Sequence, residues 1–208
     1  MKLSLLIIIV LFLWVPATAQ IEVASSDEIA IYEAILQHTI LPESMRLLPG
    51  SKPEIPTDVI LIDRTIPTCS NVRHYPMGCI SERIIQGFTS NSDNPNLSSY
   101  NPHLPVINEK NLIELLFERN AKSCSLPEIG IDGAIVTSQD RLEETVQEYS
   151  GSTKGYAGVT RPAYSNDGHA LVYAVYVRGS LSGGGWIFYL QRDADGWQVV
   201  LARQLWIS

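Results

Sequence analysis

The fold of this chain is decided by the stretch from Gly168 to Val200, GHALVYAVYVRGSLSGGGWIFYLQRDADGWQVV. Runs of β-branched and aromatic residues alternate in it with Asp-Gly and glycine-rich turns, which is typical of antiparallel strands joined by hairpins. We expect four strands, over 155–165, 169–178, 186–192 and 197–207. The sequence therefore predicts a four-strand antiparallel β-meander over 155–207.

The second of these strands has two apolar faces. Leu171 and Tyr173 alternate with Val172 and Ala174, so no face is left for water. An antiparallel strand of this kind needs cover on both sides of the sheet. We expect helices, or a partner, to supply it. The last strand carries apolar residues at every second position, which places them on one face. Arg203 interrupts this face, and we expect either a bulge there or a polar side chain that reaches the sheet edge.

The N-terminal half supplies a first helix and a short strand. Ser25 with Glu28 three residues later fits a capping box. Apolar residues follow at helical spacing as far as Leu41-Pro42, where we expect the helix to end. The run 59–62 is apolar on both faces and predicts a short buried strand.

Two further helices are predicted before the meander. Asn108 can cap one of them, and Asn120 can end it. The other spans Thr137 to Tyr149. The expected fold class is therefore α+β, with N-terminal helices packed on a C-terminal four-strand antiparallel β-meander.

The N-terminus predicts export. The chain opens with MKLSLLIIIVLFLWVPATAQ, in which Lys2 precedes an apolar run over 3–15 and an Ala-x-Ala site ends at Ala19. These are the parts of a secretory signal peptide cleaved between Ala19 and Gln20. The alternative is an uncleaved anchor, but the run is shorter than the ~20 apolar residues of a spanning helix.

We therefore expect a signal peptide over 1–19 and a single globular domain over 20–208, loop-rich over 65–106. The domain would be periplasmic or extracellular, with no membrane insertion after cleavage. The whole chain has 22 acidic residues against 15 Lys and Arg, a net charge of −7, and no basic cluster; without Lys2 the expected domain has 14 Lys and Arg, a net charge of 14 − 22 = −8. This balance argues against nucleic acid as a partner, because phosphate contacts need clustered cations.

The chain has three cysteines, and an exported protein favours pairing two of them. Cys69–Cys79 is the preferred disulfide, since it closes a short loop through Pro76 and Gly78. Cys124 with either partner stays open. The spacing Cys69-x4-His74-x4-Cys79 also matches part of a zinc knuckle, but it supplies three of the four ligands that structural zinc needs, so we predict no metal.

No motif predicts catalysis or a cofactor. Asp193-Ala194-Asp195-Gly196 lacks the later carboxylate of a calcium loop and predicts a hairpin tip. The segment 182–185 lacks the ending of a phosphate loop, so its glycines serve a turn or a close approach by another element. A thiol–imidazole pair of Cys124 with His74 or His103 is the alternative that remains conceivable.

Ligand binding has four candidate residues. Arg161 and Tyr164 lie in Thr160-Arg161-Pro162-Ala163-Tyr164, where an arginine stands among apolar or small neighbours. Arginine suits bidentate binding of a carboxylate, and the alternative is an ion pair with one of the 22 acidic residues. His74 and His103 are the other two candidates, and Pro162 favours an edge or a bulge in the strand.

The run from Gly158 to Trp197 resembles a pattern of uncharacterised exported bacterial proteins. The pattern begins with Thr160-Arg161, Tyr164-Ser165 and Asp167-Gly168. It continues with Ala-Leu-Val-Tyr at 170–173 and a Gly-x-Gly at 183–185. Its last element, Asp-Gly-x-Trp, falls on Asp195-Gly196-Trp197. The resemblance implies bacterial export and a common meander, and it brings no known activity. The order of elements is also similar to cystatin-like and NTF2-like folds, in which a helix packs on a concave sheet and often leaves a pocket.

The leading functional hypothesis is a non-catalytic exported domain that binds a small molecule or a protein. Its site would be a pocket between helix and sheet, or the loop Ser90–Pro105. One alternative is a hydrolase-type enzyme drawing on His74, His103, Arg161 or Cys124. Another is a structural or assembly subunit of the cell envelope, which would expose a large apolar patch on the outer face of the sheet.

Overall fold

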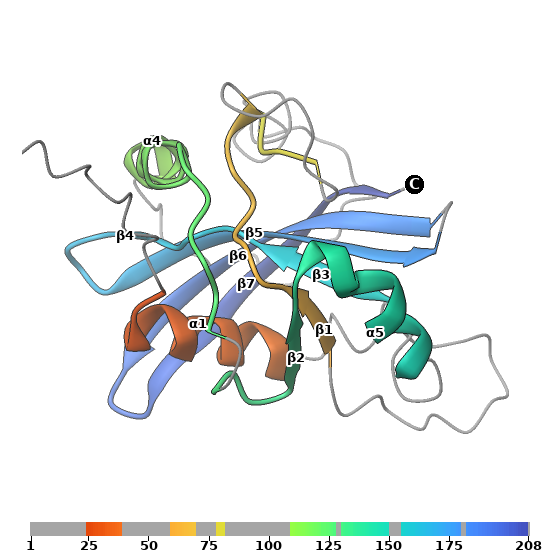
Figure 1. Cartoon of the computed structure of the whole chain (residues 1–208). Coiled ribbons are helices and arrows are strands. Elements are labelled where there is room, and N and C mark those ends of the chain that lie inside the picture. The colour runs from red at the N-terminus through yellow and green to blue at the C-terminus, as the bar shows by residue number, and fades with distance from the viewer. Residues whose placement is uncertain are drawn as a thin grey trace, which may run out of the picture.

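The computed structural model describes residues 24–38, 59–69, 78–81, 109–127, 130–149, 155–179 and 182–207. The helices are α1 (Ser26–Gln37), α4 (Glu109–Arg119), the 3-10 helix η2 (Gln139–Arg141) and α5 (Leu142–Glu148). The strands are β1 (Val59–Ile62), β2 (Ala134–Thr137), β3 (Tyr156–Val159), β4 (Ala163–Tyr164), β5 (His169–Gly179), β6 (Ser182–Asp193) and β7 (Gly196–Ile207) (Figure 1). Within these ranges no helix is long and apolar enough to cross a membrane.

The strands form one large, mostly antiparallel sheet. Its order is β2-β1-β3-β5-β6-β7, and β4 pairs with β5 beside that path. The pairs from β3 to β7 are antiparallel, whereas β1 pairs with β2 and with β3 in parallel. A few helices and such a sheet agree with the α+β class expected from the sequence.

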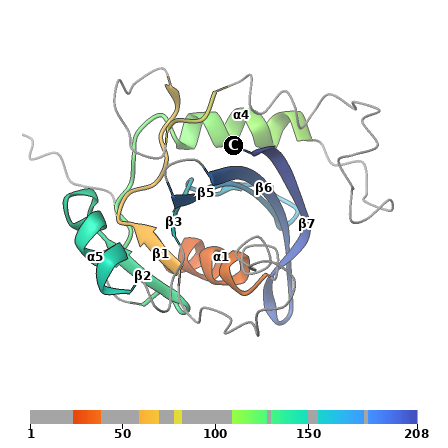
Figure 2. The same cartoon turned by 90° about the vertical axis from the view of Figure 1, so that its right-hand side faces the viewer.

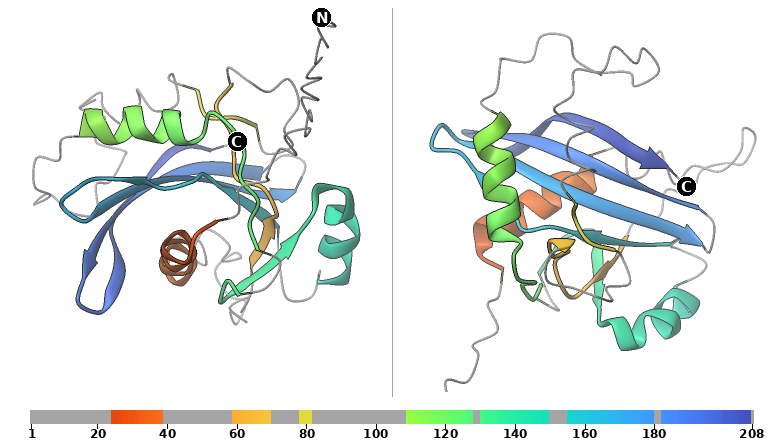
Figure 3. Two further views of the ribbon diagram at one scale, coloured as in Figure 1. Left: turned by 60° about the vertical axis from the view of Figure 1, so that its left-hand side comes forward. Right: turned by 90° about the horizontal axis from the view of Figure 1, so that it is seen from above.

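The sheet lies between α1 and α4 (Figures 2 and 3). On one face, Ile31 and Ile35 of α1 belong to an apolar cluster with Val172 and Phe188 of the sheet. On the other face, Leu112, Leu116 and Leu142 of the helices pack with Leu171, Tyr173 and Ile187. Helices therefore cover both apolar faces of β5, as its sequence requires.

Helix α1 begins at the predicted capping box. The Ser25 hydroxyl accepts a hydrogen bond from the backbone N–H of Glu28, and the Glu28 carboxylate accepts one from the backbone N–H of Ser25. The helix ends at Gln37, because His38 has an extended backbone and its N–H bonds to the carbonyl of Ile35. It thus ends before Leu41-Pro42, which lies outside the described residues.

The short strand predicted at 59–62 is β1, and all four of its residues are buried. It is an inner strand, which explains its two apolar faces.

The helix expected over Thr137–Tyr149 is shorter than predicted. Thr137 ends β2, where it pairs with Ile62, and α5 begins only at Leu142.

The first predicted strand of the meander is divided in two. β3 and β4 are separated by Thr160, Arg161 and Pro162. The Thr160 hydroxyl accepts the backbone N–H of Tyr173, and the Thr160 N–H donates to the Tyr173 carbonyl, so the side chain replaces one ladder bond where the strand breaks. The proline, which has no N–H to offer the sheet, follows directly.

The last strand does not keep the single apolar face expected from its period. Val200 and Leu205 are left without a partner in the register of β6 and β7, so the strand has two bulges. As a result, Val199 packs with the cluster on the α1 face and Leu201 with the cluster on the α4 face. Arg203 pairs with Ile187 between the bulges, on a strand at the edge of the sheet.

The glycines at 183–185 lie within β6 and not in a turn. A Cβ atom on Gly185 would overlap the indole of Trp206 and the hydroxyl of Tyr173. The missing side chain lets the Trp206 indole lie across β6 and donate its N–H to the Tyr173 hydroxyl at 2.8 Å. Of the two roles expected for these glycines, close approach is the one observed.

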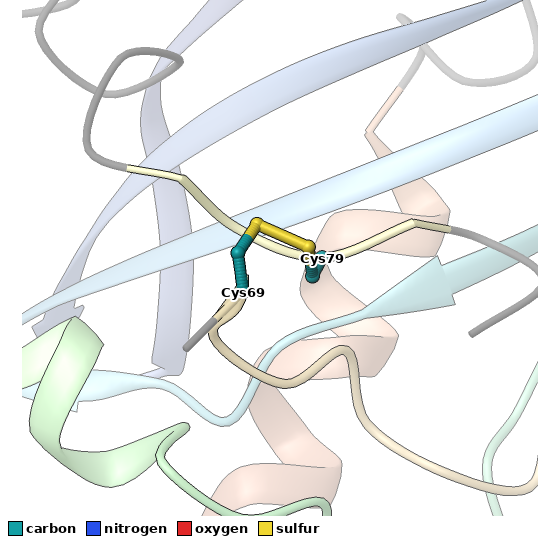
Figure 4. Close-up of a disulfide and its surroundings, with 2 residues drawn as sticks. All are labelled: Cys69 and Cys79. Atoms are coloured by element: carbon teal, nitrogen blue, oxygen red, sulfur yellow. A yellow bond between two sulfur atoms is a disulfide. The ribbon is translucent and has the colours of Figure 1, made fainter. Parts of the chain in front are cut away.

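Cys69 and Cys79 form the predicted disulfide (Figure 4). Both sulfurs of the zinc-like spacing are therefore used, which removes zinc as an alternative for them. Cys124 remains a thiol and is buried. Among the described residues, no group of three or more His, Cys, Asp or Glu side chains could hold a metal.

Candidate functional site

A buried group of charges joins the N-terminal end of α1, the C-terminal end of α4 and the link between β3 and β4. Its members are Glu28, Arg119, Arg161 and Tyr164, which we call the charge cluster. One carboxylate oxygen of Glu28 accepts hydrogen bonds from Arg119 Nη2 at 2.8 Å and from Arg161 Nε at 3.0 Å. The Glu28 side chain is 1% exposed and Arg161 is 13% exposed, so this ion pair is shielded from water, whereas Arg119 is 32% exposed.

The Glu28 carboxylate is charged at neutral pH. Burial by itself would raise its pKa. The hydrogen bond from the Ser25 N–H and the two guanidinium groups outweigh that effect, so the pKa lies below its ordinary value of 4.5. Two guanidinium groups therefore face the same charged carboxylate.

Arg161 is held through its backbone as well as its side chain. The Asn120 side chain accepts the Arg161 N–H at 2.7 Å and donates to the Arg161 carbonyl at 3.0 Å. Asn120 follows the last residue of α4 and is fully buried. The ion pair that the sequence left open for Arg161 is thus present, with Glu28 as the acid.

Arg119 lies against Tyr164. Its guanidinium carbon is 4.9 Å from the centre of the tyrosine ring, which is the geometry of a cation–π contact. Two polar atoms of this pair, Arg119 Nε and the Tyr164 hydroxyl, are buried and have no hydrogen-bond partner among the described residues. Native proteins rarely leave such groups unpaired, so this is where a bound group could supply an acceptor.

The Tyr164 hydroxyl is a donor under all ordinary conditions. Burial, followed by the negative charge of Glu28, raises its pKa well above the usual range, so the phenol keeps its proton. Its ring also lies 5.9 Å from the ring of Trp197, centre to centre. The site therefore combines cationic and neutral donors with an aromatic surface.

The β6–β7 hairpin closes the rim of the cluster. Trp197 donates its indole N–H to Asp27 at 3.4 Å, and Arg192 forms an ion pair with the same carboxylate oxygen at 3.4 Å. Arg192 and Asp27 are 57% and 43% exposed, so their attraction is screened by water. This pair lies at the exposed edge of the charge cluster.

The structure brings together two of the four candidate ligand residues, Arg161 and Tyr164. His74, His103 and the Ser90–Pro105 loop lie outside the described residues. Sequence reasoning missed Arg119 altogether and gave Glu28 only a capping role. No local pattern marks either one as part of a binding site, and the single available signal was that Arg161 needs an acidic partner.

Apolar side chains of α1 pack against the sheet. Ile31, Tyr32 and Ile35 are fully buried there, and the Tyr32 hydroxyl donates to the Thr160 carbonyl at 3.3 Å. At these three positions α1 packs directly on the sheet, and the candidate site lies at the N-terminal end of the helix.

Other parts of the described structure offer less chemistry. Cys124 is 1% exposed, and its backbone N–H donates to the Thr65 hydroxyl inside the domain. The Asp193–Gly196 segment is a hairpin tip, in which Asp193 accepts the N–H of Asp195. Of the large apolar side chains in the described ranges, Leu115 and Ile207 are the exposed ones.

No family model, curated protein or solved structure matches this chain. The resemblance to exported bacterial proteins and the likeness to cystatin-like and NTF2-like folds therefore remain predictions.

Proposed function

We propose that this chain is an exported, non-catalytic binding domain, which takes a small molecule or a group on a protein partner at the charge cluster. In this proposal the N-terminal helices and the C-terminal four-strand meander form the scaffold. The signal peptide would be cleaved between Ala19 and Gln20, and the domain would act in the periplasm or outside the cell. The Cys69–Cys79 disulfide supports an oxidising compartment.

One observation carries the proposal: Arg119 Nε and the Tyr164 hydroxyl are buried donors without acceptors among the described residues. Leaving one such group unpaired costs about 1–3 kcal/mol. A ligand that supplies acceptors to these two donors would recover this free energy. Binding sites are commonly built in this way, with a few polar groups beside aromatic ones.

Binding is supported better than catalysis by the same contacts. Arg161 is fixed by Glu28 and by Asn120, so its side chain serves the structure of the cluster. Cys124, the nucleophile of the hydrolase alternative, is buried and would need local opening to meet a substrate. A structural subunit would be supported by a contiguous apolar patch, and the large apolar side chains exposed in the described ranges, Leu115 and Ile207, lie on different elements, α4 and β7.

A thermal-melt panel of small acids, sugars and peptides tests the proposal. A ligand at 100 times its dissociation constant adds about 2.7 kcal/mol to the free energy of unfolding. We expect at least one class to raise the melting temperature of the wild type and to raise that of Tyr164→Phe much less. Equal shifts in both proteins would place binding elsewhere, and no shift with any class would contradict a small-molecule site.

A further inference from the structure

We infer that Cys69–Cys79 is a redox-active disulfide: a dithiol partner reduces it in the folded protein, and reduction releases the segment 78–81 from the domain. This inference goes beyond the proposed function and does not depend on it. Three features of the fold carry it. They are the exposure of Cys69, the isolated bridge that holds Ile80, and the separate hydrogen bonds that hold the chain before Cys69.

The disulfide can be reached by a thiol at its Cys69 end (Figure 4). Cys69 is exposed, whereas Cys79 is partly buried. A thiolate has to reach a sulfur atom of the disulfide before it can attack, so exposed disulfides are the ones that are reduced readily and that serve regulation or catalysis. Cys69 is therefore the residue at which a partner thiol attacks.

A dithiol balances the exchange. One thiolate of the partner forms a bond to the Cys69 sulfur, the bond between the two cysteine sulfurs breaks, and its electron pair leaves on Cys79 as a thiolate. The second thiol of the partner then displaces Cys69 from the mixed disulfide. The partner is oxidised to its own disulfide, both cysteines of this chain are reduced, and the two protons of the partner pass to them.

Next to the disulfide, Ile80 joins the domain through an isolated bridge. Its N–H donates to the Pro67 carbonyl and its carbonyl accepts the N–H of Cys69, each at 3.0 Å. This bridge lies outside the named strands, so it is not part of the continuous ladder of the sheet. The Ile80 side chain is fully buried in the apolar cluster that contains Ile66 and Leu116. The disulfide restricts the chain to this position, and its reduction allows the side chain to leave.

The chain before Cys69 is tied to three other parts of the domain by its backbone N–H groups. Their bonds, of 2.7 to 2.9 Å, run from Thr65 to the Cys124 carbonyl, from Ile66 to that of Val159 and from Thr68 to that of Asn120. These bonds do not involve the segment 78–81, so they persist when it is released. The opening is therefore local, and Cys124 stays buried beside Thr65.

Reduction without denaturant tests the inference, with Cys124 as an internal reporter of unfolding. The oxidised protein is treated with dithiothreitol, alkylated at intervals and mapped by mass spectrometry. We expect Cys69 and Cys79 to be labelled about tenfold faster than Cys124 or more, because local opening costs less than unfolding. Labelling of all three cysteines at one rate, or none without denaturant, overturns the inference, since the disulfide then opens only with the whole domain.

Hydrogen exchange of single amides tests the release of the segment 78–81. In the reduced protein, the protection of the Cys69 and Ile80 amides should fall about a hundredfold, as the chain-entropy account of a short loop implies. The amides of Ile66 and Thr68 should keep the protection that they have in the oxidised protein. Loss at all four amides overturns the local opening, and no loss at Cys69 and Ile80 overturns the release.

A double variant separates the missing bond from effects of the reductant. Cys69→Ser with Cys79→Ser should show the exchange pattern of the reduced wild type when no reductant is present. Cys124→Ala is the matched control, because it leaves the disulfide in place, and it should show the oxidised pattern. If the double variant does not fold, the wild type reduced after folding decides between the same two patterns.

The partner class is tested with a thioredoxin-type protein that has two neighbouring thiols, the second of them replaced by serine. This replacement stops the exchange at the mixed disulfide. We expect the trapped partner to be bonded to Cys69. A bond to Cys79 overturns Cys69 as the point of attack, and no trapped product, in a protein that dithiothreitol does reduce, overturns a dithiol protein as the partner.

Discussion

The carboxylate of Glu28 and the guanidinium of Arg161 lie 3.0 Å apart, although 133 residues separate them in the sequence. This contact joins the first turn of α1 to the link between β3 and β4. Arg119 adds the end of α4 to the same carboxylate oxygen. Since α1 and α4 pack on opposite faces of the sheet, the cluster ties the two layers of helices together at one end of the domain.

Glu28→Gln should lower the free energy of unfolding by about 3 kcal/mol, because it removes the buried charge that accepts hydrogen bonds from both arginines. The measurement is urea unfolding at neutral pH. Glu143→Gln, at an exposed position of α5, is the control and should change stability by about 0.5 kcal/mol or less. Equal stability of Glu28→Gln and wild type would show that the cluster does not stabilise the fold.

Stability should fall in acid through the same residue. The pKa of Glu28 is lower in the folded protein than its ordinary value of 4.5, so the unfolded chain takes up the proton first. The contribution is complete above pH 4.5 and is lost as the pH falls through the lower, folded-state value. Unfolding curves from about pH 6 to about pH 3 should show the wild type approaching Glu28→Gln. A difference that stays constant over this range would contradict the assignment.

Gly185→Ala should destabilise the fold by about 1–3 kcal/mol, because the added methyl group displaces the Trp206 indole from Tyr173. Gly184→Ala is the matched control. Its nearest neighbours, the Gln204 amide and the Trp206 carbonyl, are both at 3.2 Å and need to move only slightly. Thermal melts compare the two, and a larger loss in Gly184→Ala would contradict the role given to Gly185.

Reduction of the Cys69–Cys79 disulfide should lower stability by about 3 kcal/mol in the chain-entropy account of a short loop. Mass spectrometry after alkylation checks the connectivity. The native, unreduced protein should remain unmodified, because Cys124 is 1% exposed. The denatured, unreduced protein should gain one label, at Cys124. A label on Cys69 or Cys79 under these conditions would contradict the pairing.

Several elements could be predicted because their signals are local. The capping box of Ser25 and Glu28 marks the start of α1, and Asn120 marks the end of α4. The hairpin residues before Gly168 and Gly196 fix turns in which both glycines have positive φ. Each of these signals acts within a few residues of chain, where the sequence alone specifies the geometry.

Other elements could not be predicted because contacts between distant segments decide them. β2 forms by pairing in parallel with β1, and each residue of β1 precedes its partner in β2 by about 75 residues. The bulges at Val200 and Leu205 follow from fitting β7 to its neighbour, and they move Leu201 to the other face. The alternation of apolar residues along one strand does not reveal the register in which that strand pairs with its neighbour.

The candidate site divides in the same way. The sequence by itself determined that Arg161 and Tyr164 stand in an unusual setting, that Cys69 and Cys79 favour a disulfide, and that β5 needs cover on both faces. Only the tertiary structure decided that Glu28, Arg119 and Arg161 meet, because the free energy of a buried ion pair depends on the distance and shielding between its charges. Those quantities are fixed by how the helices pack on the sheet and are not written in any local run of residues.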